Sequence, residues 1–91
     1  MLQTINITIT GKVQGVFYRQ SAKDIAVQTG VTGQVKNKAD GTVEIIATGT
    51  KEQLDELLKW CRLGPPRAMV SGVGVQETTL QLFDRFSILR F

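Results

Sequence analysis

The feature that most restricts the fold is a strictly alternating segment near the N-terminus, Thr4 to Thr10, which reads T-I-N-I-T-I-T. Isoleucine occupies every second position, and threonine or asparagine lies between. Successive side chains of a strand point to opposite faces, so this segment has one apolar face and one polar face. It therefore predicts a strand in a sheet that is covered on one side only.

The elements predicted after this strand follow one another in a simple order. Apolar spacings of three and four residues indicate helices, alternation indicates strands, and Gly30 and Gly64-Pro65-Pro66 mark the two helix ends. Thr50 and Gln53 form a capping box for the second helix. In chain order, the predicted elements are a helix over 19–29, strands over 31–38 and 42–48 joined by a turn, a helix after Thr50, and strands near 69–77 and 84–91.

This order, β-α-β-β-α-β with an extra C-terminal strand, predicts an α+β fold, a two-layer α/β sandwich of ferredoxin-like type. Both helices would cover the apolar face, and the first strand would lie near the centre of the sheet. Ninety-one residues without a repeat, a linker or a low-complexity segment predict a single domain spanning residues 1–91.

Residues that are missing from the sequence restrict its chemistry. The chain has no histidine and one cysteine, Cys61, so it cannot build a Ser-His or Cys-His nucleophile system. Neither a zinc site nor an internal disulfide is indicated, and the helical stripe that includes Cys61 places this thiol in the core. Without a signal peptide or an apolar run of ~20 residues, we expect a cytoplasmic protein with no membrane partner. We also expect a monomer that uses no cofactor or metal.

The stretch Gly11 to Arg19, G-K-V-Q-G-V-F-Y-R, connects the first strand to the first helix. Backbone N–H groups at the start of a helix, together with the helix dipole, favour an anion, and an arginine fork suits phosphate or carboxylate. A plain connection with a surface arginine is the alternative. Lys12, Lys23, Lys36 and Lys38 would add a positive field if these segments meet.

Asn37 is the second candidate residue, at the end of a predicted strand and beside a turn. Its amide both donates and accepts hydrogen bonds, so it could orient a water molecule, although asparagine is also common in turns for conformational reasons. An anion site without an acidic or basic catalyst suits acyl phosphates best, because their carboxylate leaving group needs no proton near neutral pH.

Three segments resemble the acylphosphatase family. Ile9 to Arg19, I-T-G-K-V-Q-G-V-F-Y-R, is similar to its signature loop, and Gly33 to Gly49 is similar to its second signature. Gly64 to Val70, G-P-P-R-A-M-V, resembles the segment that follows the second helix in that family. The resemblance extends over essentially the whole chain.

The resemblance implies hydrolysis of a carboxyl–phosphate bond to a carboxylate and inorganic phosphate, without metal, cofactor or covalent intermediate. The substrate would be a small acyl phosphate, and inorganic phosphate would be both product and competing ligand. Arg19 matches the phosphate-binding arginine, and Asn37 matches the asparagine that positions the attacking water. The phosphate-binding loop would comprise the amides of Gln14, Gly15, Val16, Phe17, Tyr18 and Arg19.

Two positions depart from the family pattern. Tyr18 stands where the family has phenylalanine or methionine, which adds a hydroxyl that needs a partner. Gln34 stands where an aromatic residue is usual, and strand parity places it on the face opposite Asn37, so it would affect packing more than chemistry.

Two other interpretations remain open. One is a non-catalytic ferredoxin-like module that binds an anion or RNA, although polar rather than aromatic residues occupy the predicted wet face and nucleic acid is not the expected partner. The other is the related domain of a hydrogenase-maturation protein, in which cysteine-rich zinc modules follow.

Overall fold

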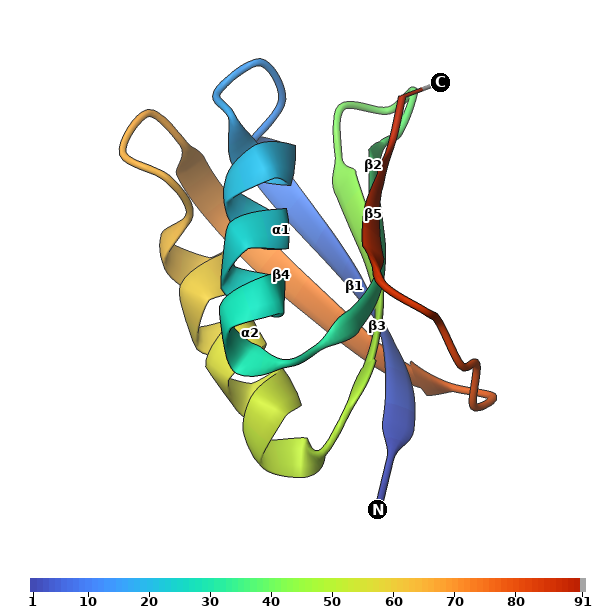
Figure 1. The fold of residues 1–91 in the computed structure, drawn as a ribbon. Helices are drawn as coiled ribbons and strands as arrows, with labels where there is room; N and C mark the ends of the chain where they lie inside the picture. The colour runs from blue at the N-terminus through green and yellow to red at the C-terminus, as the bar shows by residue number, and fades with distance from the viewer. Residues whose placement is uncertain (91) are drawn as a thin grey trace.

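The computed structural model describes residues 1–90 and consists of five strands and two helices in two layers (Figure 1). Both helices pack against the same face of the sheet. The elements are β1 (Gln3–Lys12), α1 (Tyr18–Thr29), β2 (Thr32–Asn37), β3 (Val43–Gly49), α2 (Lys51–Leu63), β4 (Met69–Thr78) and β5 (Phe86–Leu89). The predicted element order is confirmed. In residues 1–90 no helix is long and apolar enough to cross a membrane.

The strands form one sheet in the order β4-β1-β3-β2-β5. The first four pair antiparallel, as in a ferredoxin-like sandwich, and β5 adds to the edge of β2 in parallel. As predicted, β1 lies inside the sheet, paired with β3 on one side and β4 on the other. The last strand is shorter than its predicted range of 84–91, and Phe91 lies outside the described residues.

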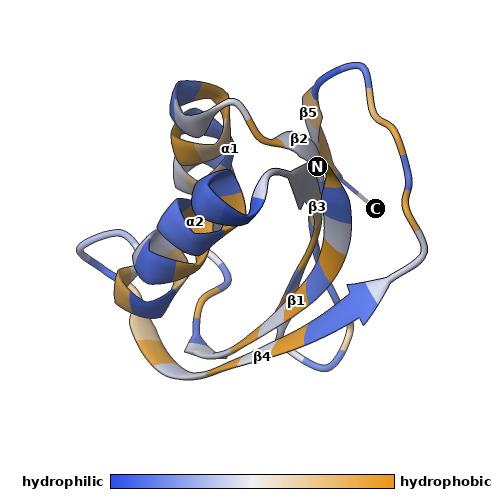
Figure 2. Cartoon of the chain, turned by 90° about the horizontal axis from the view of Figure 1, so that it is seen from below, coloured by the Kyte–Doolittle hydropathy of each residue, from blue (hydrophilic) through white to orange (hydrophobic). Residues whose placement is uncertain are grey.

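Residues 79–85 connect the two edge strands across the face of the sheet that the helices leave open (Figure 2). Thr4 and Thr48 are buried beneath this connection and share a hydroxyl–hydroxyl bond of 2.7 Å. The Thr48 hydroxyl donates to the carbonyl of Gln81 at 2.7 Å, and the amide of Gln81 donates to the Thr4 hydroxyl at 2.9 Å. These bonds hold the connection on β1 and β3, and the connection carries β5 to the far edge.

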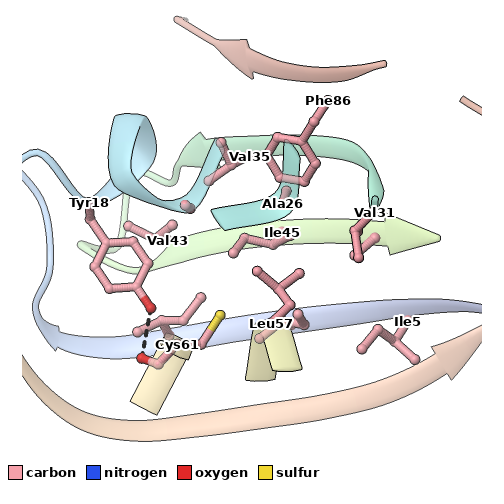
Figure 3. Close-up of a cluster of buried hydrophobic side chains, with 14 of the residues drawn as sticks. Ile5, Tyr18, Ala26, Val31, Val35, Val43, Ile45, Leu57, Cys61 and Phe86 are labelled. Carbon is pink, nitrogen blue, oxygen red and sulfur yellow. Dashed lines mark hydrogen bonds between the residues drawn. The ribbon is translucent and has the colours of Figure 1, made fainter. Parts of the chain in front are cut away.

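The core fills the space between the sheet and the helices (Figure 3). Sheet residues such as Ile7 and Ile45 are fully buried there, opposite Ala26 of α1 and Leu57 of α2. Cys61 is buried among them, and burial raises the pKa of its thiol to about 12. The prediction that Cys61 is a core residue is therefore confirmed.

The hydroxyl that Tyr18 adds finds a partner inside this core. Its Oη donates to the backbone carbonyl of Cys61 at 2.8 Å (Figure 3). Its ring centroid lies 5.0 Å from that of Trp60. Tyr18 is 1% exposed and ties the first residue of α1 to α2. Gln34 lies opposite Ile46 of β3 on the open face, away from the helices, as its parity predicted.

Candidate active site

The candidate site lies at the end of the sandwich where β1 hands over to α1 and where β2 and β5 end (Figure 1). The pairing of β1 with β4 shifts by one residue between Thr10 and Gly11. Gly11 has a φ of 119° and packs so closely against β4 that a Cβ would overlap the carbonyl of Met69. This irregularity ends the regular strand just before the connection of residues 13–17, which we call the cradle loop.

The helix that follows the cradle loop has an unusual start. Its N-cap, Phe17, is in the left-handed region at φ 64° and provides no side-chain cap, and the first turn contains no acidic residue. In contrast, α2 begins with the complete capping box of Thr50 and Gln53, with Glu52 in its first turn. A non-glycine residue in the left-handed region costs on the order of 1–2 kcal/mol. The strain at Phe17 and the open start of α1 therefore coincide.

Several backbone N–H groups at this start have no helical acceptor. The first bond of the helix runs from the amide of Ser21 to the carbonyl of Phe17 at 3.1 Å. The amides of Tyr18, Arg19 and Gln20 precede it, as in any α-helix. Gly15, at φ 72°, turns the loop beside them. Such a group of donors at the positive end of a helix dipole suits an oxyanion.

Arg19 is half-buried in the first turn of α1, and the opposite end of the chain fixes its side chain. Its Nη1 donates to the backbone carbonyl of Leu89 in β5 at 3.0 Å. One nitrogen of the guanidinium is thereby held in place, and the fork keeps further donors for a ligand. The C-terminal strand thus orients an arginine at the N-terminal loop.

Asn37 is the last residue of β2 and shares the helix-facing side with buried Val35. Its Oδ1 has lost contact with solvent and has no hydrogen-bond partner; no other buried side-chain polar atom in residues 1–90 is left in this state. An unpaired buried acceptor costs about 1–3 kcal/mol. A bound water or ligand hydroxyl at this position would therefore gain a ready acceptor.

Gln14 connects the cradle loop to the turn that follows Asn37. Its Nε2 donates to the carbonyl of Lys38 at 2.8 Å and to the carbonyl of Thr42 at 2.9 Å. Within that turn, Asp40 accepts from the Thr42 hydroxyl at 2.7 Å and from the Thr42 amide at 3.0 Å. The Thr42 hydroxyl and amide hold the pKa of the Asp40 carboxyl below its ordinary value. The loop and the turn are thus joined through one side chain.

These parts enclose a cavity of about 470 Å³. Five of the residues predicted for the site line it, namely Gly15, Phe17, Tyr18, Arg19 and Asn37. The side chains of the other two point elsewhere, because Gln14 bonds to the turn and Val16 is buried in the core. Gln14 and Val16 can contribute to the cavity only through their backbone.

The expected lysine field is not at the cavity. Strand parity places Lys36 and Lys38 on the face opposite Asn37, where their Nζ atoms lie 3.6 and 3.9 Å from the Glu44 carboxylate. Neither Lys12 nor Lys23 lines the cavity. The prediction of a positive field from these lysines was therefore wrong, and the positive charge of the lining comes from Arg19 and Arg90.

Sequence reasoning missed several lining residues, of which Gln20, Ile88 and Arg90 bear on the site. Gln20 follows Arg19 in the first turn of α1. Ile88 and Arg90 are two residues apart and continue the face of β5 that begins with buried Phe86. The alternation F-S-I-L-R is visible in the sequence, but its position beside α1 depends on the pairing of β5 with β2.

Fold and cavity together define a class: a ferredoxin-like α/β sandwich with a loop-and-helix cradle at one end of the sheet. Comparison with known proteins identifies the family within this class. The acylphosphatase family model matches residues 5–88. An acylphosphatase of Methylococcus capsulatus is 44% identical over 90 residues, which are 98% of this chain and 98% of the relative. The chain belongs to the acylphosphatase family.

Solved structures agree with this assignment. The structure of an acylphosphatase from Coxiella burnetii matches with a TM-score of 0.93 and 38% identity, over 97% of this chain and 93% of that chain. Full-length HypF in its phosphate- and nucleotide-bound form matches with a TM-score of 0.92 and 25% identity, over 99% of this chain but only 12% of that chain. The likeness to HypF is thus to a small part of a longer protein.

Proposed function

We propose that the chain hydrolyses the carboxyl–phosphate bond of small acyl phosphates, with Arg19 and cradle amides binding the phosphoryl group and Asn37 positioning the attacking water. The hydrolase class follows from membership of the acylphosphatase family. The residue roles rest on the geometry of the cavity. The observation that carries them is that Asn37, whose buried Oδ1 is unpaired, lines the same cavity as Arg19 and the uncapped start of α1.

The proposed binding mode uses donors of residues that line one cavity. Phosphoryl oxygens would accept hydrogen bonds from the N–H groups at the start of α1 and from the free part of the Arg19 fork. Preorganised donors of this kind stabilise the charge that develops on the oxygens during transfer. Because the carbonyl of Leu89 already holds the Arg19 guanidinium, little side-chain freedom is left to lose on binding.

In the proposed reaction, the oxygen of the water attacks phosphorus as the bond from phosphorus to the acyl oxygen breaks. The electron pair of that bond leaves with the carboxylate, which is a weak base and needs no proton. Asn37 accepts a hydrogen bond from the water and directs its lone pair to phosphorus. The lining residues in the described part of the chain include no carboxylate, imidazole or thiol, so both water protons end on the product phosphate.

The fold does not support the alternative of a non-catalytic module that binds RNA. Stacking of RNA bases on a ferredoxin-like sheet needs aromatic side chains on the open face. Among residues 1–90 that face carries Asn6, Lys36 and Glu44 joined in a polar cluster, and β1 to β4 contain no aromatic residue. We keep acyl phosphate and inorganic phosphate as the ligands and propose a cytoplasmic monomer without a nucleic-acid or membrane partner.

Phosphate release from benzoyl phosphate, measured beside the phosphomonoester 4-nitrophenyl phosphate, tests the reaction class. We expect rapid release from the acyl phosphate alone, and in ¹⁸O-labelled water the label should enter phosphate. Label in benzoate would show attack at carbon and would refute the proposed geometry. Equal turnover of the phosphomonoester would refute the specificity for a leaving group that needs no proton.

The variant Asn37→Ala tests the residue assignment. Loss of one preorganised polar contact typically costs on the order of a hundred- to a thousand-fold in kcat. Inorganic phosphate should still inhibit with a similar constant, because Arg19 and the start of α1 are untouched. The melting temperature should not fall, because the removed oxygen has no protein partner. A turn role predicts the reverse, with lower stability and normal turnover per folded molecule.

A further inference from the structure

The cavity contains a second arginine that the binding of one phosphoryl group does not require. Arg90 follows β5 and lies on the same face of the strand as Ile88, and both residues line the cavity. The residue between them is Leu89, whose carbonyl accepts the bond from Arg19. The contact that orients Arg19 therefore also brings Arg90 to the cavity.

The charged side chains that line the cavity in residues 1–90 are all positive. Of the residues that line the cavity in the described chain, Arg19 and Arg90 are charged and none is acidic. Arg19 is half-buried in the first turn of α1, whereas Arg90 is exposed. A half-buried cation in the first turn of α1 and an exposed cation on the same cavity form two positions for negative charge.

The cavity is larger than a phosphoryl group alone requires. Its volume of about 470 Å³ lies in the range of roughly 300–1,000 Å³ typical of sites for drug-sized ligands. A phosphoryl group with a one- or two-carbon acyl group would fill only a part of it. Phe17, which is 72% exposed, and Ile88 supply apolar wall for the carbon skeleton of a longer acyl group.

We propose that Arg90 is a specificity-determining residue that binds a second oxyanion on the acyl part of the substrate. The preferred substrates are then acyl phosphates whose acyl group carries a carboxylate or a further phosphate group. This inference rests on the proposed function. An exposed arginine at an entrance also attracts an anionic substrate before contact, so part of the effect depends on ionic strength.

The test compares two substrates of similar size that differ in one charge: 4-carboxybenzoyl phosphate and 4-methylbenzoyl phosphate. Both aromatic acids keep the second group away from the reacting centre, and 3-carboxybenzoyl phosphate samples a shorter reach. The measured quantity is the ratio of kcat/KM for the carboxylated substrate to kcat/KM for the methylated one. The parent chain is compared with Arg90→Gln and with Arg67→Gln, an exposed arginine outside the cavity lining.

We expect the ratio to exceed one in the parent and to fall roughly three- to tenfold in Arg90→Gln, the range for a charge-assisted bond at an accessible site. The change should appear mainly in KM, should shrink at high salt, and should be absent in Arg67→Gln. An equal loss with both substrates would make Arg90 part of the phosphoryl site and overturn the proposal. An unchanged ratio with both carboxylated isomers would also overturn it.

The same measurements separate this inference from the proposed function. If the parent chain did not hydrolyse 4-methylbenzoyl phosphate, the reaction class itself would fail. If it hydrolysed that substrate and the ratio did not respond to Arg90, only the second anion site would fail.

Discussion

Gln14→Met removes the side chain that joins the cradle loop to the turn after Asn37, while keeping its length and most of its volume. The two lost hydrogen bonds, of 2.8 and 2.9 Å, end on neutral backbone carbonyls. At about 0.5–1.5 kcal/mol each, they predict a loss of roughly 1–3 kcal/mol in the free energy of unfolding. Each kcal/mol lowers the melting temperature of a domain of this size by roughly 4–8 °C.

The kinetic effect should exceed what stability alone explains. The turn directly follows Asn37, the last residue of β2, so loss of the Gln14 bonds should let Asn37 move relative to the cradle loop. A displacement of about 1 Å at a reacting group can cost a hundredfold in rate. We expect kcat per folded molecule to fall about tenfold or more. Inhibition by phosphate should change less, because the carbonyl of Leu89 still orients Arg19.

Steady-state kinetics with benzoyl phosphate and thermal melts on four variants test this prediction. If Gln14 acts through Asn37, Gln14→Met should have little further effect on kcat in the Asn37→Ala background. Gln28→Met, at an exposed position of α1, controls for the introduced methionine. Normal turnover per folded molecule in Gln14→Met, or full additivity with Asn37→Ala, would refute the positioning role.

The other predictions concern metal, charge geometry and alkaline stability. Activity should survive exhaustive chelation, and loss with recovery on adding one divalent ion would contradict the proposed mechanism. Arg19→Lys keeps the charge but not the fork, so turnover and phosphate inhibition should both fall at least tenfold; near-parent values would reduce Arg19 to a general field. Burial raises the folded-state pKa of Cys61 from 9.0 to about 12 and also raises that of Tyr18. The free energy of unfolding should therefore not depend on these two groups below pH 9. The free energy of unfolding from denaturant titrations should then fall by about 1.4 kcal/mol per pH unit for each group, above pH 9 for Cys61 and above pH 10 for Tyr18, because the unfolded chain binds fewer protons; a flat profile would contradict this.

Local signals in the sequence were sufficient for the elements of this fold. The alternation of Thr4 to Thr10 needs only neighbouring residues, and it matches the burial of its three isoleucines in β1. The burial of Thr4 on the opposite face was not predicted, because it depends on the distant connection of residues 79–85. The capping box of Thr50 and Gln53 is complete within four residues and is present in the structure. Such patterns are decided by the geometry of one strand or one helix, so a sequence alone displays them.

The contacts that complete the site depend on residues distant in the chain. Arg19 and Leu89 are 70 positions apart, and their contact exists because β5 adds in parallel to β2. No local pattern specifies that pairing, so the sequence did not predict that Arg90 lines the cavity. The lysines beside Asn37 do not line the cavity for a local reason. Neighbouring residues of a strand point to opposite faces, so Lys36 and Lys38 lie on the face opposite Asn37, where both pair with Glu44.

The features that cost stability in this fold are gathered in one cavity. Phe17 adopts a left-handed backbone, the start of α1 has no side-chain cap, and Asn37 keeps an unpaired buried oxygen. Elsewhere in the described chain the same kinds of group are satisfied: α2 is fully capped, and the buried hydroxyls of Thr4 and Thr48 are bonded. Each cost is of the kind that a bound oxyanion and its attacking water would offset, since amides gain an acceptor and Asn37 gains a donor. A plain strand-to-helix connection would have no reason to combine them, which is why the cavity, and not the fold alone, carries the functional argument.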